Sequence, residues 1–169
     1  MFVYSPCEID TQVTLPDGYK AQIGGSGGHH AVFSGNITDG AGVGGLDISS
    51  LTTVTLSGDN TFDGDCKIQD VVTLRVESAT ALGSTAGDTT IEAFSWDSAL
   101  ELAGGITLPA GESISLVSFN QTAVLVNASG DNTILGDITL SSDDADVETI
   151  AGSLTLSGAV QGTRGIDKK

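Results

Sequence analysis

Large side chains and proline are scarce in this sequence of 169 residues. It contains five Phe, two Tyr, one Trp and three Pro. Aromatic residues supply much of the buried area in sandwich and barrel cores, so their scarcity argues against both architectures. The apolar residues also never run on for the roughly 20 positions that a membrane-spanning helix needs. We therefore expect no insertion into a membrane.

Basic residues and cysteines are scarce as well. Six Lys and Arg stand against 22 Asp and Glu, which gives a formal net charge of −16. Nucleic acid is not an expected partner, because a protein needs a basic surface to neutralise phosphates. Cys7 and Cys66 lie far apart and outside any Cys-x-x-Cys motif, so they do not make a disulfide framework. An acidic surface of this kind keeps a repetitive protein soluble.

One polar pentapeptide occurs twice. The letters SGDNT fill residues 57–61 and again residues 129–133, and each copy is followed by a Gly-Asp pair and an isoleucine. The copies begin 72 residues apart, which corresponds to three coils of roughly 24 residues in a solenoid. We expect Gly58 and Gly130 to form the same turn, with Asn60 and Asn132 on one edge of the stack, bonded to backbone or to each other.

Short strands are predicted between such turns. Apolar residues at alternate positions recur along the chain, bounded by Gly, Asn, Asp or Ser, and this pattern is typical of strands joined by turns. An antiparallel sandwich also has closely spaced strands, but the repeated turn favours a solenoid, in which like residues stack above like. We predict an all-β protein, a parallel β-helix whose core includes Leu56 and Leu156. The alternating pairs include Val54 with Leu56, Leu74 with Val76, Leu100 with Leu102, Ile114 with Leu116, Ile138 with Leu140, and Leu154 with Leu156.

Three regions are predicted along the chain. Residues 1–30 have an irregular pattern with Pro6 and Pro16 and end in a glycine-rich joint, so we interpret them as an N-terminal arm or cap. Residues 31–163 hold the solenoid repeats. Residues 164–169 form a C-terminal tail.

The repeat region resembles a known family. Residues 54–64 read VTLSGDNTFDG, Ile68 follows, residues 73–76 read TLRV, and residues 78–84 read SATALGS. This succession is similar to the autotransporter passenger-associated strand repeat, whose pattern runs from Leu-Ser-Gly-x-Asn-Thr through Thr-Leu-x-Val to a closing Ala-Leu-Gly. The resemblance implies a right-handed parallel β-helix. Members of the family are secreted through a C-terminal membrane barrel after a signal peptide, and this sequence shows neither.

Two groups of carboxylates are candidates for a Ca²⁺ site, since this cation binds six to eight oxygens. One group is Asp143, Asp144 and Asp146, and the other lies at residues 59–65. Neither matches an EF-hand loop or a β-roll repeat, so we interpret both as solvated turn carboxylates and expect no metal or cofactor. The adjacent His29 and His30 point to opposite sides of an extended chain, which argues against a metal site there.

Polysaccharide-acting enzymes with paired carboxylates also occur on parallel β-helices. Here the acidic residues fall in predicted corners, and the few aromatic residues do not suffice to line a sugar cleft. We therefore expect a protein without enzymatic activity and rank a polysaccharide-acting enzyme below the structural alternatives.

A stiff rod built into a larger assembly is the predicted function. Open strand edges at the ends of a β-helix invite further pairing, so we expect protein partners at the N-terminal arm or the solenoid ends, and a homo-oligomer. The sequence begins with Met1 and shows no signal peptide, which favours a phage virion component, a capsid decoration or fibre protein made in the host cytoplasm. The alternative is a stalk fragment of a secreted autotransporter adhesin at the bacterial surface.

Overall fold

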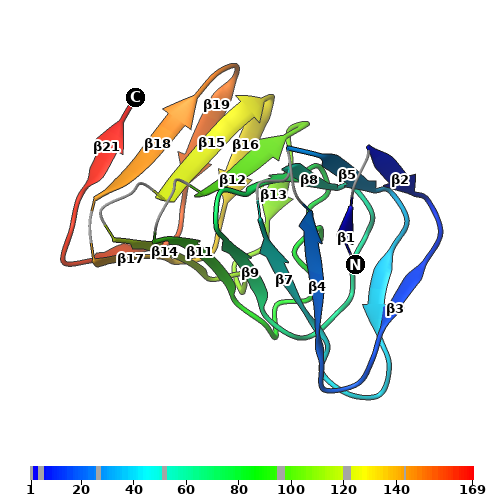
Figure 1. Ribbon diagram of the computed structural model, residues 1–169. Helices are drawn as coiled ribbons and strands as arrows, with labels where there is room; N and C mark the ends of the chain where they lie inside the picture. Colours follow the sequence, from blue (N-terminus) through cyan, green and yellow to red (C-terminus); the bar gives the residue numbers. More distant parts are fainter. Residues whose placement is uncertain are drawn as a thin grey trace.

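The chain folds into a stack of short parallel strands. The computed structural model describes residues 2–3, 6–25, 28–50, 53–94, 98–119, 123–142 and 144–169. These residues form strands and turns and contain no helix, so none of the described segments is a helix long enough to cross a membrane. Figure 1 shows the strands of successive coils side by side, from the N-terminal coils on the right to the C-terminal coils on the left. The fold is a parallel β-solenoid, which confirms the predicted fold class.

Each coil contributes one strand to each of two long sheets and passes over a third side. The first sheet contains, in order, β1 (Phe2–Val3), β4 (Lys20–Gly25), β7 (Gly45–Ser49), β9 (Cys66–Gln69), β11 (Thr89–Ala93), β14 (Ile114–Ser118), β17 (Ile138–Ser142) and β20 (Val160–Gly162). The second sheet contains β2 (Cys7–Ile9), β5 (His30–Phe33), β8 (Thr53–Leu56), β10 (Thr73–Val76), β12 (Ser98–Ala103), β15 (Ala123–Ser129), β18 (Ala145–Thr149) and β21 (Ile166–Lys168).

The third side is less regular. Its first coils pair β3 (Val13–Leu15) with β6 (Ile37–Asp39), and its last coils form a sheet of β13 (Thr107–Leu108), β16 (Asp131–Ile134) and β19 (Ser153–Leu156). Between them the chain crosses in turns. Coil length varies: Leu46 pairs with Cys66, 20 residues on, whereas Thr73 pairs with Ala99, 26 residues on. The extra residues are taken up in the corners and on this third side, so the strand register of both long sheets continues from coil to coil.

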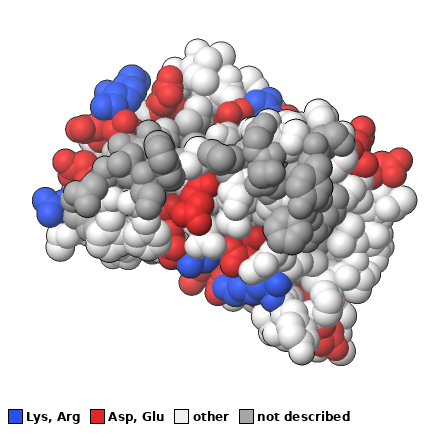
Figure 2. All heavy atoms as spheres, in the orientation of Figure 1, with Lys and Arg blue, Asp and Glu red and all other residues white. Residues whose placement is uncertain are grey.

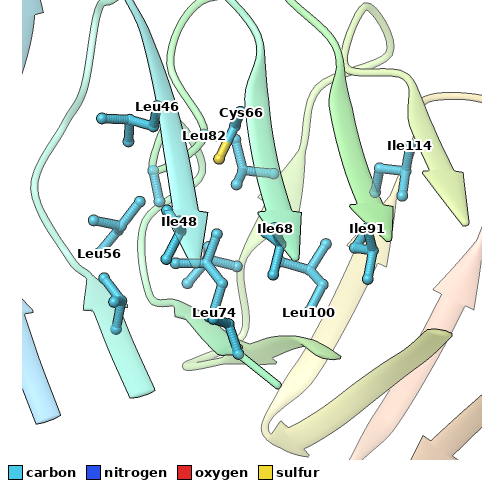
Figure 3. Packing of buried hydrophobic residues seen from close by; sticks show 14 of the residues in the cluster. Leu46, Ile48, Leu56, Cys66, Ile68, Leu74, Leu82, Ile91, Leu100 and Ile114 are labelled. Atoms are coloured by element: carbon cyan, nitrogen blue, oxygen red, sulfur yellow. The ribbon is translucent and has the colours of Figure 1, made fainter. Parts of the chain in front are cut away.

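The core is made of ladders of like side chains (Figure 3). On the first sheet one inward row runs through Ile23, Ile48, Ile68, Ile91, Leu116 and Leu140. On the second sheet one runs through Ala31, Val54, Leu74, Leu100, Leu125 and Val147. The members from Ile48 to Ile91 and from Ala31 to Leu125 are fully buried. Burying an Ile or Leu side chain stabilises the fold by about 2 kcal/mol, so these ladders carry much of the stability.

The predicted N-terminal arm is instead part of the solenoid. Within residues 1–30, β2, β3 and β4 pair in parallel with β5, β6 and β7. Pro6 and Pro16 lie just outside strands, where they cost no ladder hydrogen bond. The irregular pattern therefore marks corners, and residue 30 is no structural boundary. Of the predicted glycine joint, Gly24 and Gly25 belong to β4, while residues 26–27 lie outside the described residues.

The predicted C-terminal tail is also a strand of the stack. Ile166, Asp167 and Lys168 pair with Ala145, Asp146 and Val147 of β18. Lys168 occupies an inward position of β21, as Val147 does on β18. This charged residue interrupts the alternation of apolar residues, so the sequence does not predict a strand there. Leu56 is fully buried, but Leu156 is partly exposed. The expected burial of Leu156 is wrong because β19 is the last described strand on the third side.

Candidate functional site: the recurring turn, the turn carboxylates and the two ends

Asn60 fastens its coil to the coils on either side. Its Oδ1 accepts a hydrogen bond of 2.7 Å from Ile37 N, and its Nδ2 donates one of 2.6 Å to Ala81 O. The next residue adds to this contact, because Thr61 N donates to Ile37 O at 2.9 Å. The side chain is only 2% exposed. Asn60 thus satisfies backbone groups that would otherwise be buried without a partner, each of which costs about 1–3 kcal/mol.

Asn132 makes the same contact three coils later. Its Oδ1 accepts from Ile106 N at 2.7 Å, and Thr133 N donates to Ile106 O at 2.9 Å. The forward contact is made by a second residue: Asn132 Nδ2 donates to Asn127 Oδ1 at 2.5 Å, and Asn127 Nδ2 donates to Ala151 O at 2.7 Å. Both Asn132 and Asn127 are buried. Sequence analysis placed Asn60 and Asn132 on one edge but missed Asn127.

The two glycines of the repeated pentapeptide have different backbone shapes. A Cβ on Gly58 would lie 2.4 Å from Gly35 O, so this glycine permits the close approach of two coils. Gly130 has a φ of 81°, in the left-handed region that favours glycine. The difference follows from β15, which has one extra residue at the register shift opposite Leu102 and Ala103. Such a bulge bends the strand and changes the entry into the turn.

The turn carboxylates bind the next coil. Asp59 Oδ1 accepts from Ser78 Oγ at 2.7 Å, and Asp63 Oδ1 accepts from Ser84 Oγ at 2.6 Å. Asp137 Oδ1 accepts from Ala159 N at 2.9 Å. Asp59 and Asp63 were interpreted from the sequence as solvated, and all three residues are exposed. Their hydrogen bonds nevertheless give each a structural role, since an ionised acceptor makes stronger bonds than a neutral one.

The predicted Ca²⁺ candidates lie near the C-terminal end. Asp144 Oδ1 accepts from Gly165 N at 2.9 Å, and Asp146 Oδ1 lies 3.4 Å from Lys169 Nζ. Asp143 lies outside the described residues. No group of three or more His, Cys, Asp or Glu in a metal-binding arrangement occurs within the described residues.

Within the part of the chain that the structure describes, one carboxyl group is buried. Glu112, in the turn before β14, is 2% exposed, and its Oε1 accepts from Thr89 Oγ1 at 2.7 Å. Burial raises the pKa of Glu112 to about 7, and the nearby charge of Asp88 acts in the same direction, whereas the Thr89 hydrogen bond opposes the rise. The buried Cys66 lies close by, and burial together with Glu112 raises the pKa of its thiol. The burial of Glu112 was not predicted from the sequence, because an isolated Glu after a glycine is typical of an exposed loop.

The flank of the rod carries a few exposed apolar side chains. Phe94 and Phe119 follow neighbouring strands of the first sheet, and their rings stack with centroids 5.1 Å apart. A groove of about 360 Å³ runs along another corner past Tyr19 and Val43. Beside it Lys20 Nζ donates to Asp65 Oδ2 at 3.1 Å, which lowers the pKa of Asp65.

Both ends of the solenoid are hollow and apolar. The N-terminal hollow measures about 240 Å³ and is lined mainly by Ile9, Val13, Leu15, Ala21, Ile23 and Phe33. Beside it, the described residues of β1 pair with Gly24 and Gly25 of β4. The C-terminal hollow measures about 390 Å³ and is lined by Val147, Thr149, Leu154, Leu156, Ile166 and Lys168, among others.

Neither His29 nor His30 has metal-ligand companions among the described residues, and His30 Nε2 lies 3.4 Å from Thr55 Oγ1. A comparison of the chain with family models, with curated proteins and with solved structures finds no match.

Proposed function

We propose that this protein is a structural and interaction component of a larger assembly and not an enzyme. The observation that carries the proposal is the continuity of the parallel ladders, which run through the solenoid and end in an apolar hollow at each end. A stack in which each coil is held by its neighbours forms a stiff rod with a defined direction. Its ends offer both strand edges and apolar surface to a partner.

The hydrogen bonding of the acidic residues supports this proposal. Asp59, Asp63 and Asp137 already accept bonds from the following coil, and Glu112, the deeply buried carboxyl of the described residues, accepts a hydrogen bond from Thr89 inside the rod. A glycosidase needs two carboxyl groups facing each other across a substrate cleft. These four carboxylates instead accept hydrogen bonds between coils.

Two settings need such a rod. A phage virion is the setting that we propose first, with the protein as a capsid decoration or fibre component. The second is the stalk of a secreted adhesin, which the likeness of residues 54–84 to the autotransporter strand repeat favours.

An antiserum against the 169-residue chain tests these proposals in the organism or phage lysate that encodes it. Cosedimentation with virus particles, and gold labelling of those particles, is the expected result. Labelling of the cell surface would select the adhesin stalk. A soluble monomer that releases reducing ends from a polysaccharide panel would overturn the structural proposal. An unfolded Leu56→Asp variant provides the control for activity that depends on the fold.

A further inference from the structure

The two ends of the rod differ in charge. Residues 1–19 contain Glu8, Asp10 and Asp17 and no Lys or Arg, whereas residues 157–169 contain Arg164, Lys168 and Lys169 and a single acidic residue, Asp167. Half of the six basic residues of the chain therefore lie in its last six positions. In Figure 2 basic atoms lie beside acidic atoms at the upper left, where Figure 1 places the C-terminal coil, whereas the charged atoms visible at the right-hand end near β2 and β3 are acidic.

The two ends also have matching backbone direction. All strands of a long sheet run the same way, so a second copy stacked end to end in the same orientation continues both sheets with parallel pairing. Stacking two N-terminal ends would instead bring Glu8, Asp10 and Asp17 together with their symmetry mates, and like charges that face each other are destabilising.

We propose that copies of this chain stack head to tail, with the acidic N-terminal coil of one copy on the basic C-terminal coil of the next. This inference rests on the proposed structural function and names a second copy as the partner. The contact is heterologous, so it extends into a filament. The apolar hollows at the two ends lie within the contact, and Lys168 lines the C-terminal one.

The register of the second sheet gives the contact its detail. Lys168 pairs with the inward Val147, and Val147 belongs to the same inward row as Ala31, which pairs with Cys7. Continuing this row across the contact places Lys168 of one copy beside Cys7 of the next, and Lys169 beside Glu8. Lys169 then lies between Glu8 of the next copy and Asp146 of its own chain, 3.4 Å away.

A disulfide tests this register. Neighbouring strands lie ~4.8 Å apart, within the Cα separation of 4.4–6.8 Å that a disulfide spans. We expect Lys168→Cys to form covalent dimers and longer ladders with Cys7 of the next copy under mild oxidation, seen on non-reducing gels. Asp167→Cys is the matched control, because the neighbouring residue points to the opposite face. The Lys168→Cys variant that also carries Cys7→Ser must lose the ladders.

Sedimentation velocity gives a second measurement that does not depend on the new cysteine. We expect concentration-dependent association of the wild type that weakens in high salt, since exposed charge pairs are screened. Reversing the charge with Lys168→Glu and Lys169→Glu should weaken association by about tenfold, the effect of a few exposed ion pairs. Adding Glu8→Lys and Asp10→Lys to the same chain should restore it. Lys67→Glu, on the flank of the rod, is the control.

The outcomes separate this inference from the proposed function. A wild-type monomer at all concentrations, or disulfides that form equally well with Asp167→Cys, would overturn head-to-tail stacking. If the monomer still cosediments with particles, the structural function stands with a different partner. If Lys168→Cys does not fold, the charge-reversal and restoration series decides.

Discussion

Replacing Glu112 by Gln should stabilise the protein at alkaline pH and leave it nearly unchanged in acid. The carboxyl is buried against Thr89, and burial raises its pKa from 4.5 to about 7. A difference of this size between the folded and unfolded chain corresponds to roughly 3 kcal/mol, at 1.36 kcal/mol for each pH unit. Glutamine has nearly the same shape, and its oxygen can accept the same Thr89 hydroxyl without a charge.

The direction in which stability changes with pH follows from the number of protons bound by the folded and the unfolded chain. Below about pH 4.5 the carboxyl is protonated in both states, so its burial costs little. Between 4.5 and about 7 the unfolded chain loses its proton first, so the stability of the folded state falls as the pH rises. Above about pH 7 the folded protein contains a buried ionised carboxylate. The Glu112→Gln variant has no such group, and at pH 8 it should be the more stable by up to about 3 kcal/mol.

Urea unfolding of both proteins at pH 4, 6 and 8 measures this difference in unfolding free energy. The other carboxylates titrate alike in both proteins, so their contribution cancels when the two values are subtracted. In thermal unfolding the gain at pH 8 corresponds to roughly 6–12 °C for a chain of this size. Glu148→Gln, at an exposed position of β18, removes the same formal charge and should show no such trend. A wild-type minus variant difference that stays flat from pH 4 to pH 8 would refute the reasoning.

Three further substitutions probe the ladder, the recurring turn and the acidic corner. Leu56→Asp places a charge in the core and should lower the unfolding free energy by at least about 4 kcal/mol, whereas Leu156→Asp, at the partly exposed end, should cost about 1 kcal/mol; equal urea midpoints would contradict the described register. Asn60→Ala leaves Ile37 N and Ala81 O unpaired and should cost about 2–4 kcal/mol, so a calorimetric scan that matches the wild type would show that Asn60 is dispensable. Exchanging Asp143, Asp144 and Asp146 together for Asn should keep the fold and change mainly solubility and salt response; a calcium-dependent rise in Tm that this variant loses would establish a metal site.

Sequence reasoning predicted the architecture because stacked coils repeat their local chemistry. Alternating apolar pairs predicted the strands, and the repeated pentapeptide predicted a separation of three coils. The separation is confirmed, because β8 pairs with β10, β10 with β12 and β12 with β15. The strands at both ends of the solenoid were not predicted. Prolines and glycines in the N-terminal corners hide the alternation, and Lys168 stands at an inward position where the pattern expects an apolar residue.

The contacts between coils were harder to predict than the strands. Asn60 and Asn132 were identified because their surroundings are identical in sequence, but the partners of Asp59, Asp63 and Asp137 lie about 20 residues further on. Which residue stacks on which depends on coil length, and that length varies from 20 to 26 residues in this chain. Local propensity carries no information about that variation.

The continuous register has a consequence for how such a protein changes length. Cys66 pairs with Leu46 on one side and with Thr89 on the other, so residues 66–88 form a unit bounded by equivalent inward positions. Removing or duplicating this unit still pairs an inward residue of one coil with an inward residue of the next. It changes the length of the rod by one strand spacing, about 4.8 Å. The length of the rod can therefore change during evolution in steps of one coil, and both end surfaces stay the same.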